Sequence, residues 1–141
     1  MKTTALRVFS LIMILCLAFA LVSCNTVAAE GLWEDATYRK DEEFGDGQKT
    51  VKVEVCAGDE SVTFTVHTDK EFLGDALLQH GLIDGEDGPY GLYIKRVNGI
   101  LADYDIDASF WALSINGEYA MTGISETPVT DGEHYELTYS K

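Results

Sequence analysis

The centre of the chain alternates between apolar and polar side chains in two consecutive segments. In residues 51–55 every second residue is valine, and in residues 62–67 apolar side chains again occupy every second position. An alternation with a period of two is typical of a strand that buries one face. Between the segments lies Ala57-Gly58-Asp59-Glu60, which has the composition of a turn. The pattern predicts a β-hairpin, and any fold of this chain has to accommodate it.

A short helix is predicted directly after the hairpin. The sequence Thr68-Asp69-Lys70-Glu71 has the pattern of a capping box, which opens a helix. Apolar residues follow at helical spacing over residues 72–77, and Gly81 is suited to a left-handed C-terminal cap. We expect a helix of about 11 residues. Gly74 costs about 1 kcal/mol relative to alanine inside a helix, which indicates close packing against a strand.

The second half of the chain predicts further strands separated by turns. Residues 84–89 have the composition of a loop, and the strand after them ends at Asn98-Gly99. Asn116-Gly117 is a strong signal for a type I′ hairpin turn between an alternating strand and a returning strand at 118–121. A last strand follows Asp131-Gly132. The sequence therefore predicts an α+β fold with an N-terminal β-hairpin, one short helix and then three or four further strands.

The N-terminal residues have the pattern of a secretory signal. Lys2 and Arg7 precede a run of 15 mostly apolar residues, 8–22, which is too short for a comfortable membrane span. The run ends in Leu21-Val22-Ser23-Cys24, which resembles the bacterial lipobox. That resemblance implies cleavage before Cys24 and attachment of lipid to its thiol. We expect anchoring to the extracytoplasmic face of the cell membrane, because two or more acyl chains hold a protein stably on a bilayer.

These features divide the chain into three parts. We expect a lipoprotein signal peptide at 1–23, an acidic tether at 24–49 and a folded domain at 50–141. The tether contains Trp33, which is unusual in a spacer, and the sequence leaves open whether Trp33 packs on the domain or belongs to a loosely ordered arm. Cys56 is the one cysteine left after Cys16 and Cys24, so the mature domain has no intrachain disulfide.

The charge of the chain excludes one class of partner. The 24 acidic and 10 basic side chains give a formal net charge of −14. Nucleic-acid binding needs a basic patch, so we expect no nucleic-acid partner. Cations and neutral ligands are easier partners for such a surface.

Several blocks of the second half occur in an order that carries a family resemblance. They are Phe72-Leu73-Gly74-Asp75-Ala76-Leu77, Tyr90-Gly91-Leu92-Tyr93-Ile94, Val97-Asn98-Gly99-Ile100, Phe110-Trp111, Ile115-Asn116-Gly117-Glu118-Tyr119-Ala120, Thr130-Asp131-Gly132 and Tyr135-Glu136-Leu137-Thr138-Tyr139. In this order they resemble the bacterial domain related to the C-terminal domain of transcobalamin and intrinsic factor. The resemblance implies a β-grasp-like fold of the soluble-ligand-binding type, with cobalamin or another corrinoid as the candidate ligand. It also implies that a lone domain binds weakly or needs a partner protein, and a transporter is the candidate recipient of the captured ligand.

Aromatic side chains are the candidate ligand-binding residues. Tyr90, Tyr104 and Phe110 lie next to predicted loops and turns, where aromatic rings can contact a flat ligand. Trp111 is a further candidate, but it alternates in phase with Leu113, which favours a place in the core.

Metal binding and catalysis find weaker support in the sequence. Asp103, Asp105 and Asp107 resemble the start of a calcium loop, but Ala108 stands where that loop needs glycine. We expect a solvated acidic loop there and keep the three carboxylates as weak candidates for loose divalent-cation binding. The three histidines, His67, His80 and His134, have no metal-binding spacing, and no catalytic constellation is present, so we expect no resident metal and no enzyme activity.

Two functions remain from the sequence. The first is a lipid-anchored extracytoplasmic module that binds a small molecule, with a corrinoid captured for uptake as the candidate. The second is a cell-surface module that contacts a protein or a cell-wall polymer and has no small-molecule ligand.

Overall fold

The two alternating segments form the expected hairpin. In the computed structural model, which describes residues 31–141, β2 (Lys49–Ala57) pairs antiparallel with β3 (Glu60–Thr68), and Val53 lies opposite Phe64. The alternating apolar side chains of both strands are buried, whereas the polar residues between them are exposed or half-buried. The hairpin therefore has one face in the core and one open face.

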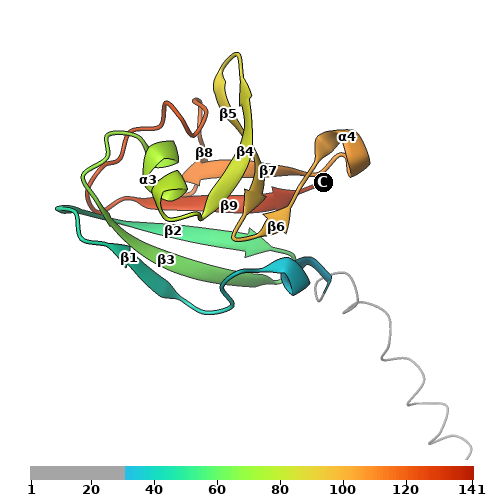
Figure 1. The fold of residues 1–141 in the computed structure, drawn as a ribbon, viewed down its shortest axis with the longest axis horizontal. Coiled ribbons are helices and arrows are strands. Elements are labelled where there is room, and N and C mark those ends of the chain that lie inside the picture. Colours follow the sequence, from blue (N-terminus) through green and yellow to red (C-terminus); the bar gives the residue numbers. More distant parts are fainter. Residues whose placement is uncertain (1–30) are drawn as a thin grey trace, which may run out of the picture.

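The hairpin belongs to a mixed sheet of six strands. Their order is β1-β3-β2-β9-β7-β8, with β1 (Glu42–Gly45), β7 (Phe110–Ile115), β8 (Glu118–Tyr119) and β9 (His134–Ser140) joining the hairpin. β1 runs parallel to β3, and β9 runs parallel to β2. The remaining pairs of this sheet are antiparallel. The chain therefore places its last strand beside β2, between the hairpin and β7 (Figure 1).

A second sheet of three strands lies across the larger one (Figure 1). It consists of β4 (Ile83–Gly88), β5 (Gly91–Val97) and β6 (Ile100–Leu101), all antiparallel. The segment 84–89 was expected to be a loop, but most of it forms β4. Its glycines permit the pairing, because a Cβ atom on Gly85 would lie 2.0 Å from the carbonyl oxygen of Tyr93.

The helix after the hairpin is shorter than expected and begins later than the expected capping box at residues 68–71. It is α3 (Leu73–Gln79), and Phe72, in an extended conformation at its N-cap, forms a bridge with Pro128. The expected capping box is wrong because Thr68 ends β3, where its hydroxyl accepts from the backbone N–H of Lys70 at 3.0 Å. The C-terminal cap is confirmed: Gly81 has φ +65°, and the N–H groups of Gly81 and Leu82 donate to the carbonyls of Leu78 and Leu77.

Gly74 packs closely, as expected, but against a loop rather than a strand. Its backbone N–H donates to the carbonyl of Ile124 at 3.0 Å. A Cβ atom at this position would lie 3.2 Å from the same carbonyl oxygen. The loop around Ile124 and Ser125 is therefore held against the helix.

The structure contains a second helix that was not expected. It is α4 (Tyr104–Asp107), where Asp103 accepts a hydrogen bond from the backbone N–H of Asp105 at 3.0 Å and caps the helix. Together with the 3₁₀ turn η1 (Trp33–Asp35), the described part of the chain is a mixed, mainly β domain with two α-helices. The β-grasp assignment stays a prediction.

The segment expected to be a tether is part of the fold from residue 31 onward. Trp33 is buried, and its indole Nε1 donates to the carbonyl of Ala57 at 2.8 Å. Farther along, β1 pairs with β3 at the edge of the sheet. Of the two alternatives for Trp33, the structure shows packing on the domain, and the folded unit therefore begins well before residue 50.

The core lies between the larger sheet on one side and the smaller sheet and α3 on the other. Its largest fully buried side chains include Tyr135, Phe64, Leu73 and Leu77. Within residues 31–141, no helix is both long and apolar enough to cross a membrane.

Candidate functional site

A groove with a volume of about 350 Å³ opens between β5, β7 and the loop that follows β8. Its lining contains no charged side chain, although the chain as a whole carries 24 acidic residues. The lining residues are Leu92, Tyr93, Ile94, Phe110, Trp111, Ala112, Leu113, Tyr119, Ala120, Thr122, Gly123 and Ile124. An uncharged, aromatic-rich groove of this size suits a neutral, partly apolar small molecule.

Trp111 contributes to the lining of the groove but is mostly buried, with 7% of its surface exposed. The indole packs edge-on against Tyr139, with ring centroids 5.7 Å apart. Its Nε1 atom is buried without an acceptor among residues 31–141, although buried N–H groups are nearly always paired in folded proteins. Trp111 therefore presents an aromatic surface to the groove, while its N–H lies in the interior.

The loop on one side of the groove is held by hydrogen bonds. The hydroxyl of Ser125 accepts from the backbone N–H of Leu92 at 2.9 Å, which connects the loop to β5. Thr127, which is fully buried, donates to the carbonyl of Gly123 at 2.9 Å. These contacts give the groove a preformed wall.

The structure brings three of the four predicted aromatic residues to this region. Phe110 and Trp111 line the groove, and Tyr90 lines an adjoining hollow at the β4–β5 turn that shares Leu92 and Gly123 with it. Tyr104 lies on α4 and lines neither of these two hollows. Trp111 is in the core, as its phase indicated, and also reaches the groove.

Sequence reasoning did not select Tyr93 and Tyr119, which also line the groove. A signal for Tyr93 was present, because it alternates with Leu92 and Ile94 and therefore points away from the core. Tyr119 is 78% exposed, so the core does not need its ring. The available clue was an aromatic residue at a strand position where the alternation places polar side chains.

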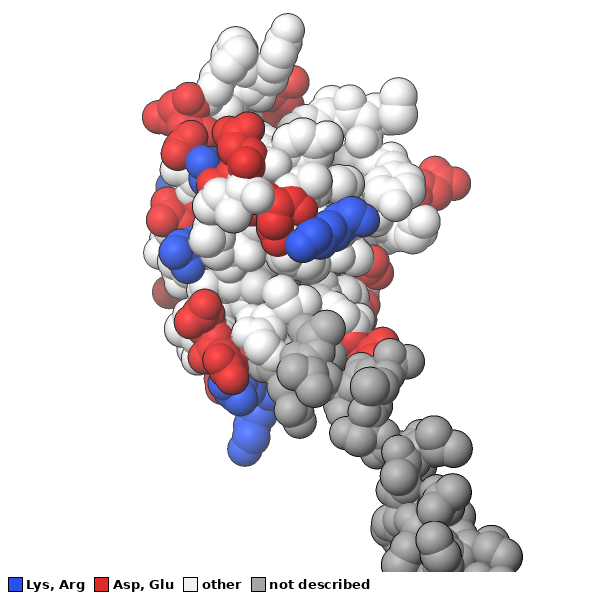
Figure 2. All heavy atoms as spheres, turned by 90° about the vertical axis from the view of Figure 1, so that its right-hand side faces the viewer, with Lys and Arg blue, Asp and Glu red and all other residues white. Residues whose placement is uncertain are grey.

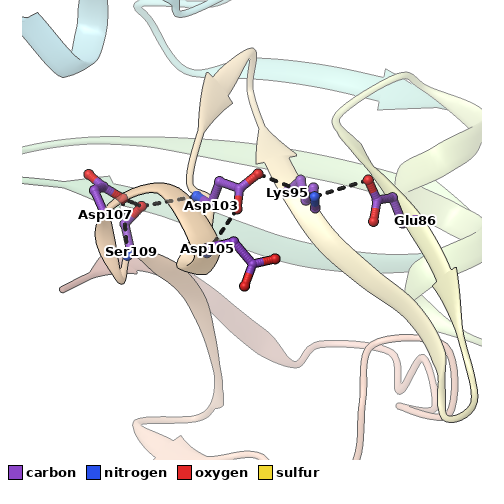
Figure 3. Close-up of polar contacts among 6 residues, drawn as sticks. All are labelled: Glu86, Lys95, Asp103, Asp105, Asp107 and Ser109. Carbon is purple, nitrogen blue, oxygen red and sulfur yellow. Dashed lines mark hydrogen bonds and ion pairs between the residues drawn. The ribbon is translucent and has the colours of Figure 1, made fainter.

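The three aspartates considered as weak metal ligands take part in linked hydrogen bonds around α4, to which Asp105 contributes its backbone N–H (Figure 3). Asp103 caps α4 and pairs with Lys95 at 3.2 Å, and Lys95 also pairs with Glu86 at 3.0 Å. Asp107 accepts from Ser109 and pairs with Lys141 at 2.9 Å. The hydrogen bond from Ser109, followed by the contact with Lys141, lowers the pKa of Asp107 from 3.8 to about 2. The described residues hold no metal-ligand group at these aspartates.

A different set of potential metal ligands lies on the open face of the larger sheet. Glu54 and Glu136 are direct neighbours in the parallel register of β2 and β9, and His134 lies two residues before Glu136. The His134 Nε2 atom is 3.0 Å from a carboxylate oxygen of Glu54. One potential ligand atom from each of the three residues lies within 4.8 Å of the others. No local spacing in the sequence indicates this group, because Glu54 and His134 are far apart along the chain.

Cys56 lies next to this group on β2. Burial, together with the negative charges of Glu54 and Glu136, raises the pKa of its thiol from 9.0 to about 12. Burial is the largest cause, and the nearby carboxylates add to it, because both disfavour the thiolate.

The predicted lipid attachment at Cys24 and the signal peptide at 1–23 lie outside the described residues.

Figure 2 shows the face on the right-hand side of Figure 1, where acidic side chains are spread widely with a few Lys and Arg among them.

Comparison with known proteins places this fold in context. Residues 71–141 match the family described as "Domain of unknown function (DUF4430)". A solved structure from Ruminococcus gnavus ATCC 29149, described as a "putative metal binding protein", is 38% identical to this chain. That match has a TM-score of 0.63 and covers 67% of this chain and 98% of the other.

A second solved structure is haptocorrin in complex with Cbi. It is 24% identical, with a TM-score of 0.54, and the match covers 70% of this chain and 26% of haptocorrin. At that identity the likeness is one of fold alone. The search of the curated proteins found no match.

Proposed function

We propose, from the premise that this chain belongs to the family described as "Domain of unknown function (DUF4430)", that it is a ligand-binding module. Its ligand is a neutral small molecule that enters the groove between β5 and β7. The observation that carries the proposal is the uncharged, aromatic-rich lining of this groove. The module is non-catalytic and has the β-grasp-like character implied by the sequence resemblance.

The proposed ligand class is a corrinoid. Haptocorrin, whose fold is similar, was solved with Cbi bound, and the sequence resembles the transcobalamin group. The groove of about 350 Å³ is at the small end of ligand pockets, so it contacts one part of a large ligand rather than enclosing it. Weak binding by the lone domain follows, and a partner protein such as a transporter would complete the site.

Equilibrium dialysis of the full chain with cobinamide and cobalamin tests this proposal. Tyr119→Ala removes an exposed ring from the groove, and Tyr104→Ala removes an exposed ring from α4, outside it. We expect Tyr119→Ala to weaken binding about tenfold, which corresponds to 1.4 kcal/mol, and Tyr104→Ala to leave it unchanged. Trp111→Phe replaces the indole that lines the groove with a smaller phenyl ring, and we expect a similar loss.

Absence of binding by either corrinoid at high micromolar concentration would overturn the corrinoid proposal. It would favour the second candidate, a cell-surface module that contacts a protein or a cell-wall polymer. Large exposed side chains support that candidate. Tyr90 is 88% exposed and Met121 is 97% exposed, and each lies within two residues in sequence of a residue that lines the groove.

A further inference from the structure

The open face of the larger sheet carries a second site, separate from the groove. Glu54 comes from β2, and His134 and Glu136 come from β9. Their neighbours Val53, Val55, Tyr135 and Leu137 are buried on the opposite face, so strand alternation directs the three polar side chains to the open face. This inference does not depend on the function proposed for the groove.

The charges of this group are unbalanced. Within residues 31–141, neither Glu54 nor Glu136 forms an ion pair with Lys or Arg. Lys52 lies on the same face, but its ammonium group donates to the Thr65 hydroxyl at 3.1 Å. Two carboxylates held close together repel each other, and a bound cation would remove that repulsion. Three other carboxylates of the described residues do have a basic partner, because Glu86 and Asp103 share Lys95 and Asp107 pairs with Lys141.

The sheet holds the three ligands in place without a metal. The hydrogen-bonded register of β2 and β9 sets Glu54 beside Glu136 and Lys52 beside His134. All three ligand side chains are half-buried, which limits competition from solvent. A site whose ligands are fixed by neighbouring strands loses little conformational entropy when it binds an ion.

We propose that Glu54, His134 and Glu136 bind one divalent transition-metal ion of the zinc class. Imidazole nitrogen suits zinc and related ions, and carboxylate oxygens are also zinc ligands. Three protein ligands leave at least one coordination position for water or an external ligand.

The same sheet face provides a matched control. His67 on β3 pairs with Glu43 on β1, with the Nε2 atom 2.6 Å from a carboxylate oxygen. This pair has a histidine and a glutamate but belongs to no group of three ligands. A metal ion that needs three protein ligands would therefore bind at the group of Glu54, His134 and Glu136 and not at the pair of Glu43 and His67.

The test is isothermal titration of the full chain, stripped with a chelator, with ZnCl₂. We expect one Zn²⁺ ion per chain, and Glu136→Gln to weaken binding at least tenfold while Glu43→Gln leaves it unchanged. Zn²⁺ should also raise the melting temperature of the parent and of Glu43→Gln, but not that of Glu136→Gln. Co²⁺ absorption provides a spectroscopic measure of ligation, and the same loss is expected there.

Three results would overturn the proposal. The first is no binding of Zn²⁺ by the parent at high micromolar concentration. The second is undiminished binding by Glu136→Gln, which would place the ion elsewhere in the chain. The third is equal weakening by Glu136→Gln and Glu43→Gln, which would indicate diffuse attraction to an acidic surface. If Glu136→Gln does not fold, as judged by circular dichroism, Glu54→Gln takes its place with the same expectations.

Discussion

At the scale of single residues, the acidic side chains of this protein have different structural roles. Asp103 caps a helix and Asp107 joins α4 to Lys141. Glu54 and Glu136 instead lie side by side without a Lys or Arg partner among the described residues. Residue type alone does not distinguish these roles. The partners of each carboxylate decide whether it stabilises the fold or is available to an ion.

Asp107 gives a pH-dependent prediction. In the folded protein the pKa of Asp107 is about 2, which lies below the ordinary 3.8. The contribution of its carboxylate to the free energy of unfolding is therefore present above pH 3.8 and is lost as the pH falls through about 2. Asp107→Asn should therefore be less stable than the parent at pH 6, and the difference should shrink toward pH 2. Urea unfolding at several pH values measures this.

The control for this prediction is Asp105→Asn, in the same helix. The Asp105 carboxylate has no ion pair among residues 31–141. Its substitution should change stability little at any of these pH values. A difference between Asp107→Asn and the parent that stays constant from pH 6 to pH 2 would contradict the expected role of the carboxylate.

At the scale of elements, the N-terminal segment is joined to the domain by a buried side chain. Asn98 is 1% exposed, and its amide donates to the carbonyl of Tyr38 at 2.7 Å and accepts from the N–H of Tyr38 at 2.8 Å. Its backbone carbonyl also accepts from Thr37 at 2.8 Å. The turn Asn98-Gly99 therefore ends β5 and also holds the segment before β1.

Asn98→Ala should destabilise the protein because it removes the two hydrogen bonds between the buried Asn98 amide and the backbone of Tyr38. Asn116→Ala is the comparison, since Asn116 has a similar φ, 50° against 51°, and its exposed side chain accepts from the His134 N–H at 3.2 Å. Both variants strain the backbone and lose side-chain hydrogen bonds, but only those of Asn98 involve a buried side chain. We expect Asn98→Ala to lose about 1–3 kcal/mol more in urea unfolding than Asn116→Ala. Equal losses would contradict the larger contribution expected from the buried side chain.

Most elements could be predicted from the sequence, but their extent and partners could not. The β2–β3 hairpin, the Asn116-Gly117 turn with positive φ at both residues, and the last strand are confirmed. β4 was missed because its glycines and acidic residues are poor strand formers that gain their structure from pairing with β5. β1 was missed because it is a short edge strand with little alternation.

At the scale of the whole molecule, the residue at which the fold begins limits how far the domain can lie from a membrane. If Cys24 carries the lipid, eight residues separate it from Trp33, the first buried residue of the fold. Eight residues span at most about 30 Å even when fully extended. The domain would therefore remain close to the bilayer surface, nearer than a free tether ending at residue 49 would hold it.

Substitution of Cys24 tests the anchor. In cells of the native host, the parent should fractionate with membranes and be removed by protease added outside the cytoplasmic membrane. Cys24→Ser should shift the protein out of the membrane fraction, because one side chain carries all the acyl chains. Cys56→Ser is the control and should leave the distribution unchanged. A parent found in the soluble cytoplasmic fraction would contradict the proposed location.

The groove and the ligand group on the sheet face depend on the whole fold. The groove joins residues of β5, β7 and the loop after β8, and the ligand group joins β2 to β9. The sequence indicated Phe110 and Trp111 as aromatic candidates, and Tyr90 reaches an adjoining hollow. The combination of Glu54 with His134 could not be selected without knowing which strands are neighbours.

The sequence by itself determined the features that depend on contiguous residues. Side-chain alternation selects a buried strand face, and Asn-Gly and glycine positions allow turns and caps that need positive φ. The tertiary structure alone decided that β9 pairs with β2, that residues 31–49 join the domain, and that two glutamates and a histidine meet. The physical reason is that these contacts connect residues far apart in the chain, and their free energy comes from burial and pairing that no local segment contains.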